Sequence, residues 1–210
     1  MIRLEKGDEP QVLVDNGARW TAELLNKIAL GEEPSPYLLT RYGHADIKQA
    51  LLAETHEKCA YCESPFRHVT YGDVEHIIPK HSNPDLRFSW FNLTLACDVC
   101  NTNKGQSEVL DPYHQDPSEA FFFLGPMIWP TPGNADGITA EATLDLNRAP
   151  LVQRRIERLS YLLSLVESAH GKPPDVRNAI LSKVRRECAK NQPFSACSTS
   201  ALHQILTVQP

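Results

Sequence analysis

Two Cys-x-x-Cys pairs are the feature that most constrains the fold of this 210-residue chain. Cys59 and Cys62 form the first pair, Cys97 and Cys100 form the second, and 34 residues separate the pairs. Thiolates at positions i and i+3 of a tight turn can bind the same ion, and a tetrahedral Zn²⁺ takes four such ligands. We therefore expect one structural zinc site with no open coordination position, which closes the intervening residues into a compact unit.

Disulfide and redox uses of these cysteines are less favoured. The N-terminal stretch MIRLEKGDEP has no apolar core and no small-residue cleavage site, so we expect no secretory signal and a cytoplasmic location, where disulfides are rare. A thiol redox motif needs only one pair, usually after a strand of a βαβ pattern that is absent here. Cys188 and Cys197 lack metal-ligand spacing and are expected to be buried free thiols. No apolar run is long enough for a membrane helix.

Hydrophobic spacing predicts a mostly helical chain around a small β unit. We expect strands over 73–78 and 88–97, a linker over 32–39, and an extended loop over 111–137 with one helical turn near 118–123. The expected helices cover 18–30, 44–57, 149–169, a stretch from Pro174 to about residue 190, and 198–207. The chain is thus predicted to be an α+β protein in which a ββ-plus-helix unit is embedded in helices.

Charge is distributed unevenly along the chain, whose net charge is −5. Residues 1–147 carry a net charge of −11 and residues 148–210 a net charge of +6. The C-terminal part is therefore expected to present a basic surface, with Arg154, Arg155 and Arg158 as one patch on a helix and Lys183, Arg185 and Arg186 nearby. Such a surface would hold nucleic acid or dock onto an acidic partner, although a solvated helical face is an equally simple interpretation.

The residues between and after the cysteine pairs contain an ordered set of polar groups. These stretches are DVEHIIPK at 73–80, WFNLTLAC at 90–97 and CNTNKG at 100–105. An acid beside a histidine, a later asparagine and an asparagine directly after the last cysteine occur in that order. The set resembles the zinc-stapled branch of the HNH, or ββα-metal, endonucleases. The resemblance implies three segments: an N-terminal helical segment over 1–58, an HNH nuclease core over 59–115, and a C-terminal loop and helical region over 116–210.

The same resemblance implies the chemistry of phosphodiester hydrolysis, which needs an activated water and charge neutralisation on the phosphate. It assigns the roles as follows: His76 as general base, Glu75 and Asn101 as ligands of a catalytic Mg²⁺ or Mn²⁺, Asn92 as the residue that orients the loop or ring of His76, and Lys80 and Lys104 as contacts to the nucleic acid. A neutral imidazole is suited to accept the proton of water. Because adjacent residues of an ideal strand face opposite ways, Asp73 or His81 is a rival metal ligand unless the strand bends.

A wider resemblance involves MIRLEKGDEPQVL at the start, HEKCAYCE around the first cysteine pair, LDP at 110–112 and ATLDLNR at 142–148. These stretches are similar to the effector nucleases of Septu-type and related retron anti-phage systems, the PtuB family. The resemblance implies a partner ATPase subunit of the PtuA type and a nucleic-acid substrate, with DNA favoured over RNA. A non-catalytic Cys₄ module that binds nucleic acid or an ATPase, and a stand-alone restriction-type HNH DNase, are the alternatives.

Overall fold

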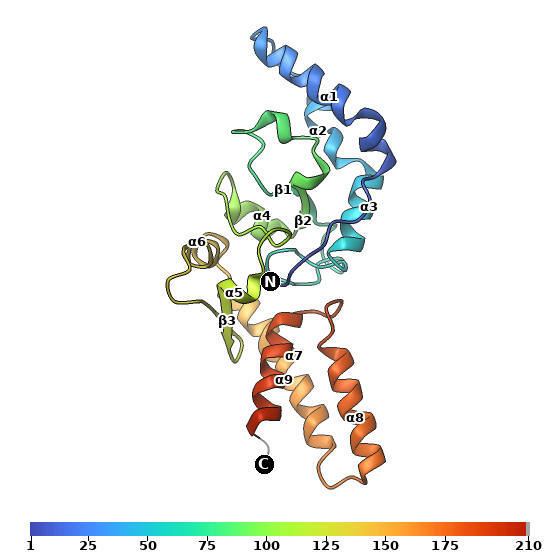
Figure 1. Ribbon diagram of the computed structural model, residues 1–210, viewed down its shortest axis with the longest axis vertical. Helices are drawn as coiled ribbons and strands as arrows, with labels where there is room; N and C mark the ends of the chain where they lie inside the picture. Colours follow the sequence, from blue (N-terminus) through green and yellow to red (C-terminus); the bar gives the residue numbers. More distant parts are fainter. Residues whose placement is uncertain (209–210) are drawn as a thin grey trace.

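The computed structural model describes residues 1–208, with side chains described as far as Gln204. The molecule is elongated and mostly helical: α1 lies at one end, the β1–β2–α4 unit lies in the middle, and α7–α9 form the other end (Figure 1). The N-terminus lies near the middle, close to where the C-terminal helices begin (Figure 1). The elements of the first half are α1 (Gln11–Ala29), α2 (Pro36–Thr40), the 3₁₀ turn η1 (Arg41–Gly43) and α3 (Ala45–Glu54).

The N-terminal helices differ from the sequence prediction at two points. Helix α1 starts at Gln11, directly after Pro10, so the predicted start at residue 18 is wrong, although Trp20 and Leu24 are buried as expected. The predicted linker over 32–39 is also only partly correct, because α2 begins inside it at Pro36. Proline suits the first turn of a helix, where its missing N–H is not needed, and the Ser35 hydroxyl accepts a hydrogen bond from the Leu38 N–H at 3.2 Å.

The central unit is a two-stranded antiparallel sheet with one helix against it. Strand β1 (Asp73–His76) pairs with β2 (Leu93–Ala96), and α4 (Asp98–Lys104) follows β2 after one residue, Cys97. The predicted strand over 88–97 is too long, because residues Trp90–Asn92 form the 3₁₀ turn η3; a further 3₁₀ turn, η2, covers Pro84–Leu86. This ββα arrangement confirms the expected α+β fold.

The extended loop predicted over 111–137 is wrong, because this region contains further regular elements, although a helical turn does lie near the expected position. They are α5 (Pro117–Ala120), strands β3 (Phe121–Leu124) and β4 (Met127–Pro130), and the start of α6 (Ala135–Leu144). The two strands form an antiparallel hairpin, with Gly125 at φ +57° as the first central residue of the turn. Prolines at the edges of these elements misled the prediction, since a proline is tolerated at a helix start or a strand end.

The C-terminal end consists of three helices, α7 (Ala149–Ser168), α8 (Pro174–Glu187) and α9 (Ser195–Val208), as predicted. A small core between α7 and α8 contains Leu162, Val166, Val184 and Cys188, whereas the main core draws on all three predicted segments. The boundaries at residues 58 and 115 therefore stay a prediction. Cys188 and Cys197 are buried free thiols, as expected. None of the helices within residues 1–208 combines the length and apolarity needed to cross a membrane.

Candidate active site and metal centre

The four cysteines of the two pairs form one cluster. Their sulfur atoms all lie within 4.8 Å of one another, and all four side chains are buried. The Cys62 and Cys97 sulfurs are 3.9 Å apart, about the edge of a tetrahedron with Zn–S bonds near 2.3 Å and about twice the length of a disulfide bond. The cluster therefore fits a closed Cys₄ zinc site. Within residues 1–208 it is the one group of three or more His, Cys, Asp or Glu side chains found close enough to share an ion.

Local structure explains why the two Cys-x-x-Cys turns lie next to each other. The Glu63 N–H donates to the Cys59 carbonyl at 3.0 Å, and Glu63 adopts a positive φ of 60°, which closes the first turn. The Ala60 N–H donates to the Leu95 carbonyl at 2.9 Å and so ties this turn to β2, which leads directly into the second pair. Arg148 lies outside the cluster, with Nη2 3.5 Å from the Cys100 sulfur, where its charge favours the thiolate.

Glu75 of β1 and Lys104 of α4 form a buried ion pair within the ββα unit. The Lys104 Nζ donates to Glu75 Oε1 at 3.0 Å and to the His76 carbonyl at 2.8 Å, and the side chains are 0% and 8% exposed for Lys104 and Glu75. Burial raises the pKa of Glu75, and the charge of Lys104 opposes that rise. In this arrangement the Lys104 ammonium is bound inside the protein, so its predicted contact with a phosphate requires the pair to open.

Asn101 lies next to Asp73 rather than in contact with Glu75. The Asn101 Nδ2 donates to Asp73 Oδ2 at 2.8 Å, on the solvent-exposed part of the β1–α4 contact. Asp73 and Glu75 are two apart on β1 and therefore face the same side, toward α4. Three oxygen-bearing side chains are thus gathered between β1 and α4, which keeps Asp73 as a rival ligand. The other rival, His81, lies exposed in the loop after β1.

His76 points to the other side of β1 and is 2% exposed. Its Nε2 lies 3.0 Å from the Arg87 carbonyl oxygen, which can only accept, so Nε2 carries the proton in the neutral ring and the lone pair lies on Nδ1. Burial lowers the pKa of His76 to about 3, so the ring is neutral at pH 7. Nδ1 is buried and has no partner among the described residues. The ring therefore presents an unused acceptor nitrogen.

Asn92 connects the turn before β2 to the loop that follows His76. Its Oδ1 accepts the Ile78 N–H at 2.8 Å, and its Nδ2 donates to the Ile78 carbonyl at 3.0 Å and to the Leu86 carbonyl at 3.3 Å. One buried amide thus fixes both polar groups of the residue two positions after His76. This placement is the one that an orienting role for Asn92 requires.

Sequence reasoning missed the residues that surround the His76 ring. Tyr42 of η1 meets this ring edge to face, with the ring centres 4.6 Å apart. Its hydroxyl lies 2.8 Å from Lys80 Nζ, and the Arg87 guanidinium lies 5.6 Å from the centre of the tyrosine ring. Tyr42 is separated from His76 by more than 30 residues, and no local pattern in the sequence marks this contact.

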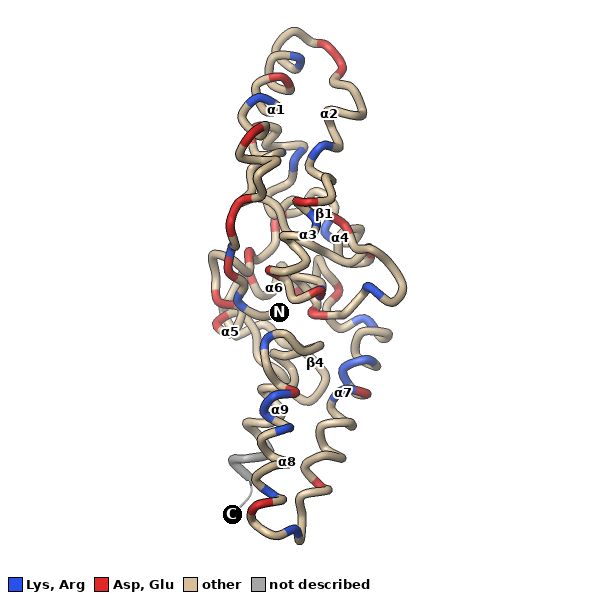
Figure 2. The backbone as a smooth tube through the Cα atoms, turned by 90° about the vertical axis from the view of Figure 1, so that its right-hand side faces the viewer, with Lys and Arg blue, Asp and Glu red and all other residues tan. Residues whose placement is uncertain are grey.

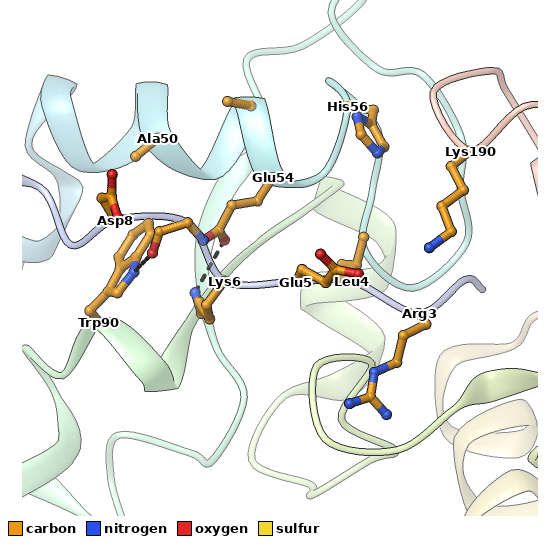
Figure 3. A pocket seen from close by; sticks show the side chains of 12 residues that line it. Arg3, Leu4, Glu5, Lys6, Asp8, Ala50, Glu54, His56, Trp90 and Lys190 are labelled. Atoms are coloured by element: carbon orange, nitrogen blue, oxygen red, sulfur yellow. Dashed lines mark hydrogen bonds and ion pairs between the residues drawn. The ribbon is translucent and has the colours of Figure 1, made fainter.

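A separate hollow of about 570 Å³ lies between residues 3–8 and α3 (Figure 3). Lys6 donates to Glu54 Oε2 at 3.2 Å and to the Leu93 carbonyl at 2.5 Å, and its ammonium lies 4.0 Å from the centre of the Trp90 ring. Glu54 in turn accepts the Gly7 N–H at 2.7 Å. Lys6 and Glu54 therefore neutralise each other within the protein. We interpret these contacts as the attachment of residues 3–8 to α3 and assign no ligand to the hollow.

Comparison with known proteins identifies the central unit. Residues 59–107, which include both cysteine pairs and the intervening polar residues, match the HNH endonuclease family. The chain is also 32% identical over 124 residues to the Septu protein PtuB of Bacillus thuringiensis. That alignment covers 56% of this chain and 44% of the relative, so the chain spans less than half of the relative's length. The chain therefore carries an HNH endonuclease domain and is similar to a PtuB protein over part of its length.

Proposed function

We propose that this chain is a metal-dependent HNH endonuclease that hydrolyses phosphodiester bonds of nucleic acid, as the nuclease subunit of an anti-phage complex with an ATPase. The environment of the His76 ring is the main support. The neutral imidazole has its Nε2–H held by a backbone carbonyl and keeps the lone pair of Nδ1 free. Burial disfavours the protonated ring in this closed arrangement, so the ring becomes an effective base only when the site opens to solvent and substrate. It lies within the residues that match the nuclease family.

In this proposal His76 acts as the general base for the attacking water. The Arg87 carbonyl fixes the tautomer, and Asn92 fixes the loop after His76, so the lone pair of Nδ1 keeps one direction. A base held in this way contributes on the order of 10² to 10⁴-fold in rate. Because the ring is 2% exposed, the contacts over it must open to admit a nucleic-acid strand.

The catalytic cation would be held between β1 and α4 by Glu75 and Asn101, with Asp73 as a rival or additional ligand. Because His76 faces the other side of β1, the ion and the base can act on one phosphodiester only if the end of β1 bends. These side chains offer hard oxygen atoms, and the two carboxylates against the one ammonium of Lys104 leave net negative charge, which suits Mg²⁺ or Mn²⁺. When bound, such an ion neutralises charge on the phosphate and helps the alkoxide leave. Lys104 would have to release Glu75 for that residue to bind the ion.

A non-catalytic zinc module that binds nucleic acid or an ATPase is the second candidate. The burial of His76 and the pairing of Glu75 with Lys104 favour it, since both groups are withdrawn from solvent in this arrangement. Replacement of His76 by alanine separates the two candidates. A nuclease loses Mg²⁺-dependent cleavage and keeps its zinc, whereas a binding module has no cleavage to lose.

The ATPase partner is proposed from the similarity to the Septu protein PtuB. Co-purification of the chain with a PtuA-type ATPase, followed by cleavage assays with and without that subunit, tests it. Full cleavage by the isolated chain, with no association, would instead favour a stand-alone restriction-type DNase. DNA is the substrate we favour, with RNA as the comparison in the same assay.

A basic C-terminal surface remains part of the proposal as a surface that docks onto the ATPase rather than one that holds the nucleic acid, but its composition differs from the prediction. Arg155 is buried and donates to the Leu146 carbonyl at 2.9 Å, so it does not belong to a surface patch. Arg154 and Arg158 are ion-paired with Glu157 and Glu187. Exposed basic residues remain along α8, among them Lys183, Arg185 and Arg186 (Figure 2).

A further inference from the structure

Tyr42, Lys80 and Arg87 form a cluster of one aromatic and two cationic side chains next to His76; we call it the η1 cluster. Lys80 Nζ lies 2.8 Å from the Tyr42 hydroxyl and 4.8 Å from the centre of the Tyr42 ring. The Arg87 guanidinium lies 5.6 Å from the same ring, and Arg87 Nε donates to the Leu39 carbonyl at 3.0 Å. The aromatic ring comes from the N-terminal segment, whereas both cations come from the nuclease unit.

The two cations of the η1 cluster have no acidic side chain in ion-pair contact among the described residues, although the charge of Lys80 reaches the Glu75 carboxyl and opposes the rise in its pKa. Within the part of the chain that the structure describes, neither Lys80 nor Arg87 forms a salt bridge, whereas Arg41 nearby is paired with Glu23 at 2.9 Å. Both side chains are only half-buried, so a ligand can approach them. A partly desolvated cation without a directly paired carboxylate favours an incoming anion. Without a bound anion, the Tyr42 ring and the Leu39 carbonyl hold the two cations in place.

The unpartnered Nδ1 of His76 is a second and independent sign of a ligand on this side. The side chain is 2% exposed, and a buried polar nitrogen without a hydrogen bond is costly unless something occupies it in the working state. Tyr42 contacts this same ring, so the η1 cluster lies beside the imidazole that carries the unpartnered nitrogen. Cations beside a candidate general base are what recognition of a phosphodiester backbone requires.

We propose that the η1 cluster is a subsite for a backbone phosphate of the nucleic-acid strand, adjacent to the phosphodiester on which His76 acts. Lys80 and Arg87 bind the phosphate oxygens, and Tyr42 positions both cations and covers His76 until the strand arrives. The N-terminal segment thereby completes the substrate site of the nuclease unit. This inference rests on the proposed nuclease function and adds Tyr42 and Arg87 to it.

The experiment measures binding by the full-length His76→Ala protein, so that the probe stays intact. The probes are a fluorescein-labelled DNA duplex and the corresponding single strand, titrated at several salt concentrations. We expect Lys80→Gln and Arg87→Gln each to weaken binding on the order of tenfold, because a charge-assisted hydrogen bond is lost. Each change should lower the slope of log affinity against log salt by about 1, while Lys80→Arg and Arg87→Lys retain most of the affinity.

Lys183→Gln and Arg186→Gln on α8 are the matched controls, since both residues are exposed cations in the C-terminal helical end. They should leave affinity and salt slope nearly unchanged. The subsite is overturned if the His76→Ala protein binds the probe and the added Lys80 or Arg87 substitutions leave its affinity unchanged. That result leaves the nuclease function in place. A larger loss in the α8 variants overturns the subsite as well and moves the strand to the C-terminal end. If the wild type does not cleave nucleic acid and the His76→Ala protein does not bind the DNA probes, the proposed function and the subsite are both contradicted.

Tyr42 has its own test, because its role is to position the cations. Tyr42→Phe removes only the hydroxyl that contacts Lys80, and Tyr42→Leu removes the ring as well. We expect a small loss of affinity for the first variant and a larger loss for the second, at unchanged zinc content and melting temperature. Equal affinity for all three proteins would contradict the positioning role.

Discussion

Replacement of Asn92 by alanine should separate the stability of the nuclease unit from its activity. The change leaves three partly buried polar groups without the side chain that binds them: the N–H and carbonyl of Ile78 and the carbonyl of Leu86. An unsatisfied buried group costs about 1 to 3 kcal/mol, and the 3.3 Å contact to Leu86 contributes least. We therefore expect a loss of about 2 to 4 kcal/mol in the free energy of unfolding.

Asn147 provides a matched control with the same geometry elsewhere in the chain. Its Oδ1 accepts the Ile128 N–H at 3.0 Å, and its Nδ2 donates to the Ile128 carbonyl at 2.7 Å and to Glu141 at 3.0 Å. Asn147→Ala should destabilise by a similar or slightly smaller amount, because this residue is half-buried. It should leave cleavage per folded molecule unchanged, since Ile128 lies in the hairpin and not beside His76.

The two variants are compared by urea unfolding and by cleavage at a temperature where both remain folded. Asn92→Ala should lose most of its cleavage, because the loop after His76 is no longer fixed. Equal cleavage by the two variants would refute the orienting role of Asn92. A loss of stability well below 1 kcal/mol in Asn92→Ala would instead refute the view that its three hydrogen bonds stabilise the loop.

Three further results are expected. Cys97→Ser should remove the zinc and unfold the nuclease unit, because a structural zinc site contributes folding energy directly; unchanged metal content and melting would show that the site is wrong. Lys104→Met should destabilise by about 3 to 5 kcal/mol, since it leaves the Glu75 carboxylate buried without its cation, and adding Glu75→Gln should recover much of that loss, as unfolding curves of the single and double variants would reveal. Arg155→Met should lower the melting temperature, whereas Arg154→Ala should leave it nearly unchanged, because only Arg155 is buried and bound to backbone carbonyls; equal effects in a thermal scan would contradict the distinction.

The parts of the site that depend on local spacing could be predicted from the sequence. Two Cys-x-x-Cys turns bring thiols together wherever the turns meet, and the cluster of four buried sulfurs follows that expectation. Helices with a regular apolar repeat, such as α3 with Ile47 and Leu51 on its buried face, were also predictable. Both features arise from residues a few positions apart.

The features that depend on packing could not be predicted in this way. The position of Tyr42 against His76 depends on how the N-terminal segment folds over the sheet, which no short pattern encodes. Arg155 reads as a surface cation, yet the β3–β4 hairpin covers it and the Pro126 carbonyl accepts a hydrogen bond from it. The prolines of the hairpin favour a loop when only the sequence is considered, although a proline is also tolerated at a strand end. The direction in which Glu75 and Lys104 face, toward each other and away from solvent, is likewise a result of packing α4 on β1.

If the chain is a nuclease of the proposed kind, it cleaves nucleic acid through His76 in a reaction that needs a divalent cation. The most direct measurement incubates purified wild-type and His76→Ala proteins with plasmid DNA, single-stranded DNA and tRNA, with and without added Mg²⁺, after zinc content and melting temperature are shown to match. We expect Mg²⁺-dependent cleavage by the wild type and a loss on the order of 10² to 10⁴-fold in the variant. Cleavage at equal rates by the two proteins, or no cleavage of any substrate by the wild type with or without the ATPase, would contradict the proposed function.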